Sequence, residues 1–99
     1  MPNVAVEQIR LDPNGRLRLR PASPSTYPYI YRAALSVRWD EISSELYVLD
    51  VPGFDALAEF KQIRAAVAQE YGDQLALSPR TKYLGMSAEL VAAFRESAG

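Results

Sequence analysis

The sequence predicts an α+β fold: a twisted antiparallel sheet of four to five strands built from two hairpins, one long helix packed on a face of the sheet and a short C-terminal helix. Three features indicate it. Two successive regions pair short apolar runs on either side of a turn, and one later stretch carries apolar residues at helical spacing. Because 99 residues are enough for one core, we expect a single domain over residues 1–99.

The first hairpin is predicted from the turn at Asp12–Gly15, whose Asp-Pro-Asn-Gly sequence suits a three-residue loop with a bulge. Pairing Leu11 with Leu17 across this turn places Ile9 opposite Leu19. Four aliphatic side chains then share one face, so the turn chemistry and the hydrophobic alternation agree on the register.

The start of the first strand does not keep this phase. Val4 and Val6 alternate out of step with the apolar residues that follow, so we expect a bulge near residues 7–8 or a change of sheet partner. Three arginines fall on the opposite face of the second strand, where a solvated face is a more ordinary interpretation than a phosphate-binding stripe: Arg16, Arg18 and Arg20.

A connector rich in proline and hydroxyl residues, Pro21–Pro28, leads to the second hairpin, and the segment Tyr29–Ala34 is compatible with either a strand or a short helix. Alternation then predicts a strand over Leu35–Trp39 and a returning strand over Glu45–Leu49. Opposing Trp39 to Leu46 puts Val37 opposite Val48 and leaves Ile42 near the loop tip.

The long helix is the clearest element of the sequence. The stretch Asp50–Gly53 ends the strands, and the helix begins near Phe54 or Asp55 and runs to about Tyr71, with Gly72 as its C-terminal cap. Its buried stripe is predicted to contain Leu57, Phe60, Ile63, Val67 and Tyr71. Four polar residues are expected to face elsewhere: Glu59, Gln62, Gln69 and Glu70.

The last third of the chain contains shorter elements. Residues 75–77 form an apolar run that can return to the sheet as a strand, and residues 82–84 extend it or stand alone. Ser87 is a good N-cap for a final helix, whose apolar side contains Leu90, Val91 and Phe94.

Composition excludes several chemistries. The chain has no cysteine and no histidine, so disulfides, thiol nucleophiles, imidazole metal sites and Ser-His-Asp triads are impossible within it. Catalysis would have to use carboxylate, lysine, tyrosine or arginine; we assign no catalytic residue and expect neither a cofactor nor a metal. Without a signal sequence or a long apolar run, we expect a cytoplasmic protein with no membrane contact.

Charge is uneven along the chain. Residues 1–38 carry six arginines against two acids, whereas residues 39–99 carry five cations against ten acids. Such asymmetry can mark a nucleic-acid surface, but attraction within the fold or between subunits is the more ordinary interpretation at an overall pI of 5.4.

Six residues are candidates for a ligand site or an interface: Tyr27, Tyr29, Tyr31, Arg32, Trp39 and Tyr47. In an extended chain the first three rings would stand on one side near an arginine, an arrangement that can stack nucleobases, although packing against the sheet is commoner. Three carboxylates around one hairpin loop are interpreted as solvated loop charges rather than a catalytic or cation site: Asp40, Glu41 and Glu45.

The chain resembles a family of small, uncharacterised bacterial proteins encoded on mobile integron gene cassettes. The resemblance rests on GRLRLRP at 15–21, YIYRAALSVRWD at 29–40, LYVLDVPG at 46–53, EFKQIRAAVAQEYG at 59–72 and LAL at 75–77. It implies a compact α+β fold and a tendency to self-associate, and it transfers no catalytic residue. In that pattern a tryptophan often stands where this chain has Glu59.

Three hypotheses for function follow. The first is a non-enzymatic homo-oligomeric protein that binds a small ligand or a protein partner, because tyrosine, tryptophan and arginine are enriched in interfaces. The second is a small enzyme that uses carboxylate, tyrosine and arginine in a subunit cleft and needs a buried acid with a raised pKa. The third and least favoured is a weak nucleic-acid binder that uses the strand arginines and the tyrosines.

Overall fold

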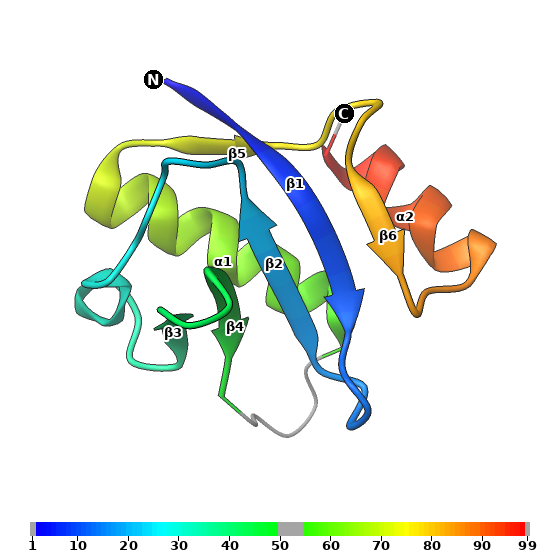
Figure 1. Ribbon diagram of the computed structural model, residues 1–99, viewed down its shortest axis with the longest axis horizontal. Helices are drawn as coiled ribbons and strands as arrows, with labels where there is room; N and C mark the ends of the chain where they lie inside the picture. The colour runs from blue at the N-terminus through cyan, green and yellow to red at the C-terminus, as the bar shows by residue number, and fades with distance from the viewer. Residues whose placement is uncertain (1, 50–54, 99) are drawn as a thin grey trace.

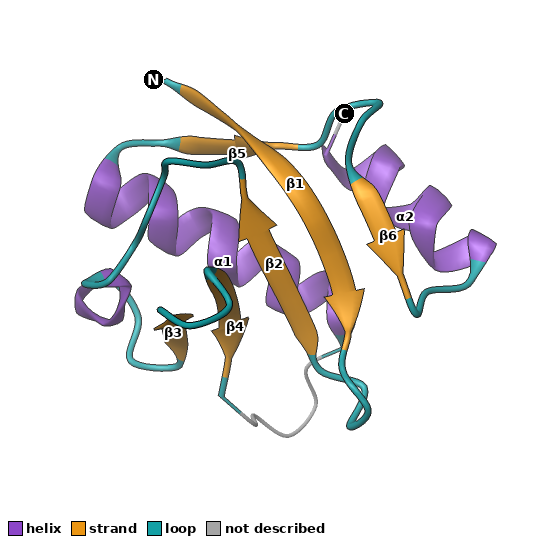
Figure 2. Ribbon diagram, viewed as in Figure 1, coloured by secondary structure: helices purple, strands orange, loops and turns teal. Residues whose placement is uncertain are grey.

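The computed structural model describes residues 2–49 and 55–98, which form a six-stranded sheet with two α-helices and one short 3-10 helix (Figure 1). Figure 2 shows the long helix crossing behind the sheet. The elements are, in chain order, β1 (Asn3–Leu11), β2 (Leu17–Pro21), η1 (Ile30–Arg32), β3 (Val37–Asp40), β4 (Glu45–Val48), α1 (Ala56–Tyr71), β5 (Gln74–Ala76), β6 (Lys82–Leu84) and α2 (Ala88–Ala98). The α+β class is therefore confirmed.

The sheet is mixed rather than purely antiparallel. Its order is β3-β4-β2-β1-β5, and the two predicted hairpins form its antiparallel part. Both β5 and β6 pair with β1 in parallel, β5 beside its first half and β6 beside its second. Parallel pairing requires a crossover, and α1 supplies it by carrying the chain back across one face.

The first hairpin has the predicted register. Leu11 faces Leu17 and Ile9 faces Leu19, and the backbone N–H of Asp12 donates to the carbonyl of Arg16 at 2.8 Å. The register shifts between residues 6 and 8, which confirms the bulge inferred from the phase of the two valines. Because the bulge restores the phase of the apolar residues, both halves of β1 contribute buried side chains to one core.

The second hairpin also has the predicted register, with Trp39 opposite Leu46 and Val37 opposite Val48. Its first strand starts later than expected. The segment before it forms η1 and a turn in which the N–H of Val37 donates to the carbonyl of Ala34 at 3.1 Å. Leu35 therefore lies outside the strand and is 76% exposed, so its predicted place on the core face is wrong.

The long helix begins as predicted. Asp55 is its N-cap and accepts a hydrogen bond from the N–H of Ala58 at 2.8 Å, and Gly72 ends it with a left-handed φ of 70°. Of the predicted stripe, three members are fully buried and the other two pack partly buried against the core: Phe60, Ile63 and Val67, then Leu57 and Tyr71. The expected strand end at 50–53 and a start at Phe54 lie outside the described residues.

The C-terminal helix covers the β6 side of the sheet (Figure 1). Ser87 is its predicted N-cap, since its hydroxyl accepts a hydrogen bond from the N–H of Leu90 at 3.2 Å. The ring of Phe94 packs edge-on against that of Phe60 at 5.1 Å, which joins α2 to the core under α1. In the described part of the chain, neither helix is long and apolar enough to cross a membrane.

Candidate functional site

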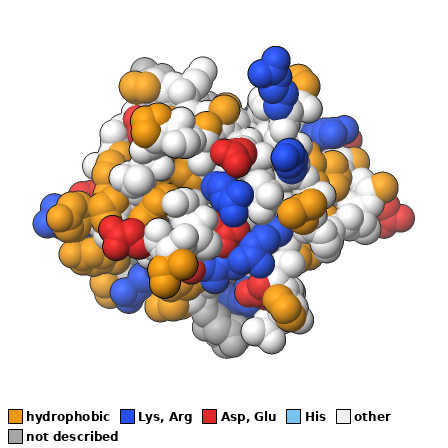
Figure 3. Space-filling model, viewed as in Figure 1, with side chains coloured by type: hydrophobic (Ala, Val, Ile, Leu, Met, Phe, Trp, Pro, Cys, Tyr) orange, Lys and Arg blue, Asp and Glu red, His pale blue; other side chains and the backbone are white. Residues whose placement is uncertain are grey.

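The sheet face that α1 does not cover, here called the open face, carries a row of polar side chains. Strand pairing sets Arg10, Arg18, Tyr47 and Arg38 side by side across four strands. Figure 3 views the molecule from this side and shows Lys and Arg side chains mixed with acidic ones in the middle of the face. The register of the strands therefore aligns charged side chains into one surface on the open face.

A buried carboxylate holds this cluster together. Glu45 is fully buried although it lies on the open face, because two arginines cover it. The Nε and second guanidinium nitrogen of Arg10 donate to both oxygens of Glu45 at 2.8 and 2.9 Å, and the Nε of Arg18 donates to one of them at 3.0 Å. Arg18 also donates to Asp40 and lies over the ring of Tyr47 at 4.6 Å. One acid thus ties three strands together.

The cluster keeps its acids ionised. Burial by itself would raise the pKa of Glu45, but the hydrogen bonds and charges of Arg10 and Arg18 outweigh burial and lower it. The backbone N–H groups of Ser43 and Ile42, together with Arg18, lower the pKa of Asp40. The expectation of solvated loop charges is wrong for Glu45, which is fully buried, whereas Asp40 stays 31% exposed while bound to Arg18 and Glu41 is exposed as expected. Glu45 and Asp40 are fixed anions and not proton donors near neutral pH.

A second buried carboxylate lies under the other face. Glu59 of α1 is 1% exposed, so its predicted place away from the core is wrong. Its Oε1 lies 3.5 Å from the Nε of Arg16, while its Oε2 is buried without a hydrogen bond from the described residues. Burial raises the pKa of Glu59, and the charge of Arg16 opposes this only in part. Spacing could have revealed it, since Glu59 is four residues before Ile63 and eight before Val67, on the same side of the helix.

The six candidate residues do not form one surface. Tyr27 is 1% exposed and lies in the core with its ring edge-on to those of Trp39 and Tyr71, at 5.9 and 4.8 Å. Its hydroxyl donates to Asp73 at 3.1 Å, and burial with this acid raises the pKa of Tyr27 to about 12. Trp39 packs partly buried on the same side, while Tyr47 is on the open face.

The other three candidates lie on or next to η1. Because η1 replaces an extended chain, the three tyrosine rings do not line up as expected. Tyr29 and Tyr31 remain 51% and 40% exposed, with their ring centres 6.5 Å apart and Arg32 over the Tyr29 ring at 4.8 Å. The backbone N–H of Tyr29 donates to the hydroxyl of Tyr71 at 2.8 Å, which anchors this exposed pair to α1.

Exposed apolar side chains surround the neighbouring edge strand, β3. Leu35 precedes the strand, Ile42 follows it at 98% exposure, and η1 packs against it. We call Tyr29, Tyr31, Leu35 and Ile42 the β3 patch. Figure 3 shows hydrophobic side chains gathered on the left of the molecule, where η1 and β3 lie in Figure 1.

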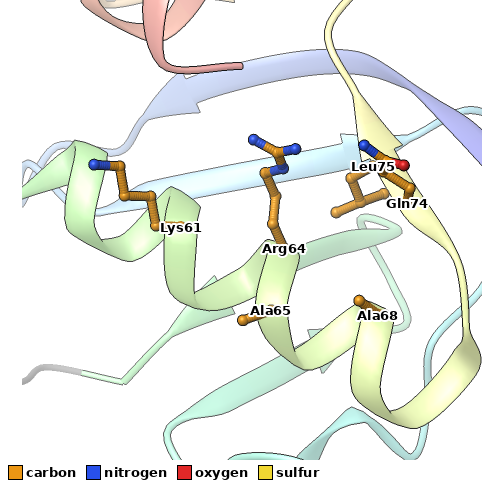
Figure 4. Close-up of a pocket in the computed structure, with 6 residues that line it drawn as sticks. All are labelled: Lys61, Arg64, Ala65, Ala68, Gln74 and Leu75. Carbon is orange, nitrogen blue, oxygen red and sulfur yellow. The ribbon is translucent and has the colours of Figure 1, made fainter. Parts of the chain in front are cut away.

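The hollows described here are open to solvent rather than deep. One of about 300 Å³ lies between α1 and β5 and is lined by Lys61, Arg64, Ala65, Ala68, Gln74 and Leu75 (Figure 4). It has two cations and no acid, so it suits a small anion more than proton transfer. Within residues 2–49 and 55–98, no three acids lie close enough together to hold a metal ion.

Comparison with known proteins identifies a family. The family model described as "Integron Cassette Protein Hfx_Cass5" matches residues 3–81. A solved structure from the mobile metagenome of North West Arm Sewage Outfall, also titled Integron Cassette Protein Hfx_Cass5, is 34% identical over 99% of this chain and 97% of its own, with a TM-score of 0.48. Comparison with curated proteins gave no match.

Proposed function

The chain belongs to the Hfx_Cass5 integron cassette protein family, whose function is unknown, and we propose that it is a non-enzymatic interaction protein that works as a homo-oligomer. The β3 patch is the contact surface in this proposal, with a further protein or small ligand bound beside it. The expected cytoplasmic location belongs to the same proposal and is tested by fractionating cells that express the chain.

One observation carries the proposal: the two most exposed large apolar side chains of the described residues lie just before and just after one edge strand, β3. Leu35 and Ile42 are 76% and 98% exposed, and the half-exposed Tyr29 and Tyr31 belong to the segment around η1, which packs against the same strand. Contiguous exposed apolar side chains with aromatic rings and arginine are typical of protein interfaces. Arg32, stacked on the Tyr29 ring, adds the cation that such surfaces favour.

The ion pairs of the open face also favour an interaction protein over a nucleic-acid binder or an enzyme. Arg10 and Arg18 are bound to Glu45, and the Nη1 of Arg20 lies 3.7 Å from Glu7. Arginines already neutralised by acids have little charge left for phosphates, which weakens the nucleic-acid alternative. An ionised Glu45 is also a poor general acid.

The small-enzyme alternative retains one specific observation, the buried Glu59 with a raised pKa. That alternative also needs a deep pocket at the acid. A hollow of about 360 Å³ on the open face is bordered by its partner Arg16 but not by Glu59 itself, and Glu59 does not line the hollow between α1 and β5 either. The interaction proposal is therefore better supported.

Sedimentation velocity over micromolar concentrations tests the proposal. We expect self-association that weakens on dilution, and we expect Leu35→Ser to weaken it further. Leu84→Ser is the matched control, because Leu84 is 47% exposed on β6 at the other side of the sheet. A strict monomer at every concentration would rule out the homo-oligomer.

A further inference from the structure

Two cations of α1, Lys61 and Arg64, border the hollow between that helix and β5. Neither forms an ion pair with an acid of the described residues, whereas the arginines of β1 and β2 do. The sequence of the helix explains this, since the positions three and four residues from each cation hold apolar residues or the other cation. The hollow therefore carries positive charge that the described chain does not neutralise.

Arg64 is held in place by the core beneath it. Its guanidinium carbon lies 5.6 Å from the centre of the Phe60 ring, one turn earlier in the helix. That ring is fully buried and packs edge-on against Phe94 at 5.1 Å. An arginine that is positioned before a ligand arrives loses less side-chain freedom when it binds one.

The lining between the polar groups is apolar. Ala65 and Ala68 line the helix side with a single methyl group each, which leaves the space, and the fully buried Leu75 lines the β5 side. Binding sites for small molecules combine such a lining with a few polar groups that fix the orientation of the ligand. A hollow of about 300 Å³ is at the small end of this class, so it suits a ligand of few atoms.

The polar groups are spread along the hollow. Figure 4 shows Arg64 directed to the side of α1 where Gln74 and Leu75 lie, while Lys61 extends away from them along the helix. A guanidinium group can donate two parallel hydrogen bonds to one carboxylate, and a side-chain amide can donate another. Arg64 and Gln74 can thus hold one carboxylate, with the charge of Lys61 attracting it from farther along the helix.

From this geometry we propose that the hollow binds a small organic carboxylate with a short apolar body. The carboxylate pairs with Arg64 and the apolar body lies over Ala65 and Ala68. An inorganic anion such as phosphate would use the same cations but would leave the apolar lining in water, so the lining favours the organic ligand.

This site goes beyond the interaction proposed above and does not depend on it. β5 and β3 are at opposite ends of the strand order, and no residue of the β3 patch lines the hollow. Binding is therefore expected in a monomer and in an oligomer alike. Failure of either proposal leaves the other standing.

Calorimetric titration of the wild-type protein with hexanoate tests the site, with hexanamide and inorganic phosphate as comparison ligands. Hexanamide keeps the apolar body without the charge, and phosphate keeps the charge without the apolar body. We expect hexanoate to bind with a dissociation constant of about 1 mM and the other two at least about tenfold more weakly. Equal binding of either comparison ligand, or no binding of hexanoate at about 10 mM, would overturn the proposal.

A charge variant places the ligand at Arg64. Arg64→Gln removes the paired donors, and we expect hexanoate to bind about tenfold more weakly or worse. Arg95→Gln is the matched control, because Arg95 is also a helical arginine, lies 5.5 Å from the ring centre of Tyr83 and does not line the hollow. An equal loss in the two variants would mean that hexanoate responds to overall charge and not to this site.

A filling variant tests the hollow itself. Ala65→Leu keeps both cations and a good helix former while it occupies the apolar lining, so hexanoate should bind about tenfold more weakly. Ala92→Leu makes the same change at an exposed position of α2 and should leave binding unchanged. Binding of hexanoate to Ala65→Leu as tight as to the wild type would show that the ligand does not enter the hollow.

Discussion

The open face and the β3 patch each contain a tyrosine ring on which an arginine is stacked, yet they differ in how their groups are satisfied. On the open face, Arg10 and Arg18 bind the buried Glu45 and one arginine stacks on Tyr47. In the β3 patch, Leu35 and Ile42 have no cover from the described chain. The difference shows that a row of arginines on a strand can be internal structure, whereas the apolar patch is the surface that the proposed homo-oligomer would bury.

The largest expected effect is on the open face. Glu45→Ala leaves two arginines beside an empty buried position, and loss of one partner from a buried ion cluster costs about 3 kcal/mol of unfolding free energy. Denaturant unfolding measures it. Glu41→Ala, an exposed neighbour, should change stability by no more than about 0.5 kcal/mol. Equal effects of the two variants would mean that the cluster is not structural.

The two buried carboxylates should respond to pH with opposite signs. Burial acts to raise the pKa of Glu45, but arginine contacts outweigh it and hold that pKa below 4.5 in the folded protein. The stability that ionised Glu45 contributes is therefore present above pH 4.5 and is lost as the pH falls through the lower pKa of the folded state. Burial holds the pKa of Glu59 above 4.5, so stability falls as pH rises from 4.5 through the higher folded value. Across this pH range, the unfolding free energy of Glu45→Gln should lack the loss of stability at low pH. That of Glu59→Gln should lack the loss of stability as the pH rises. Slopes of the same sign would contradict this account of the two sites.

A smaller effect separates the buried tyrosine from the exposed one. Tyr27→Phe removes the hydroxyl that donates to Asp73 and should cost about 1 kcal/mol in thermal or denaturant unfolding. Tyr31→Phe is the matched control, and its exposed position predicts almost no change. If Tyr31→Phe were the more destabilising variant, the division of the tyrosines between core and surface would be wrong.

The smallest effect on stability is expected in the β3 patch. The double variant Leu35→Ser and Ile42→Ser removes exposed apolar groups and should change the unfolding free energy of the monomer by no more than about 0.5 kcal/mol. Unfolding at concentrations below the dissociation constant measures the monomer alone. A loss as large as that of Glu45→Ala would show that the patch is covered within one chain.

Local features of the fold were predictable from the sequence. The Asp12–Gly15 turn fixes the first register, the alternation around Trp39 fixes the second, and Asp55 and Gly72 mark the ends of α1. Each of these signals lies within a few residues of the structure it specifies, so no knowledge of distant contacts is needed.

The non-local features were not predictable. Pairing of β2 with β4 brings Arg18 beside Glu45, 27 residues away, and neither hairpin encodes this contact. The parallel additions of β5 and β6 to β1 depend on the path of α1 across the sheet. The same holds for Tyr27, whose burial requires Trp39 and Tyr71 to meet it in the core, so its place among the surface candidates could not be judged from spacing.

Trp39 is a natural optical probe of the proposed interface, because it is the only tryptophan and lies on the edge strand beside the β3 patch. Wild-type protein is diluted while sedimentation reports its mass and fluorescence reports the surroundings of Trp39. We predict that the mass halves and the emission shifts to longer wavelength over the same concentration range, as the indole gains contact with water. A protein that stays monomeric, or that dissociates while the emission of Trp39 does not change, would contradict an interface at this edge.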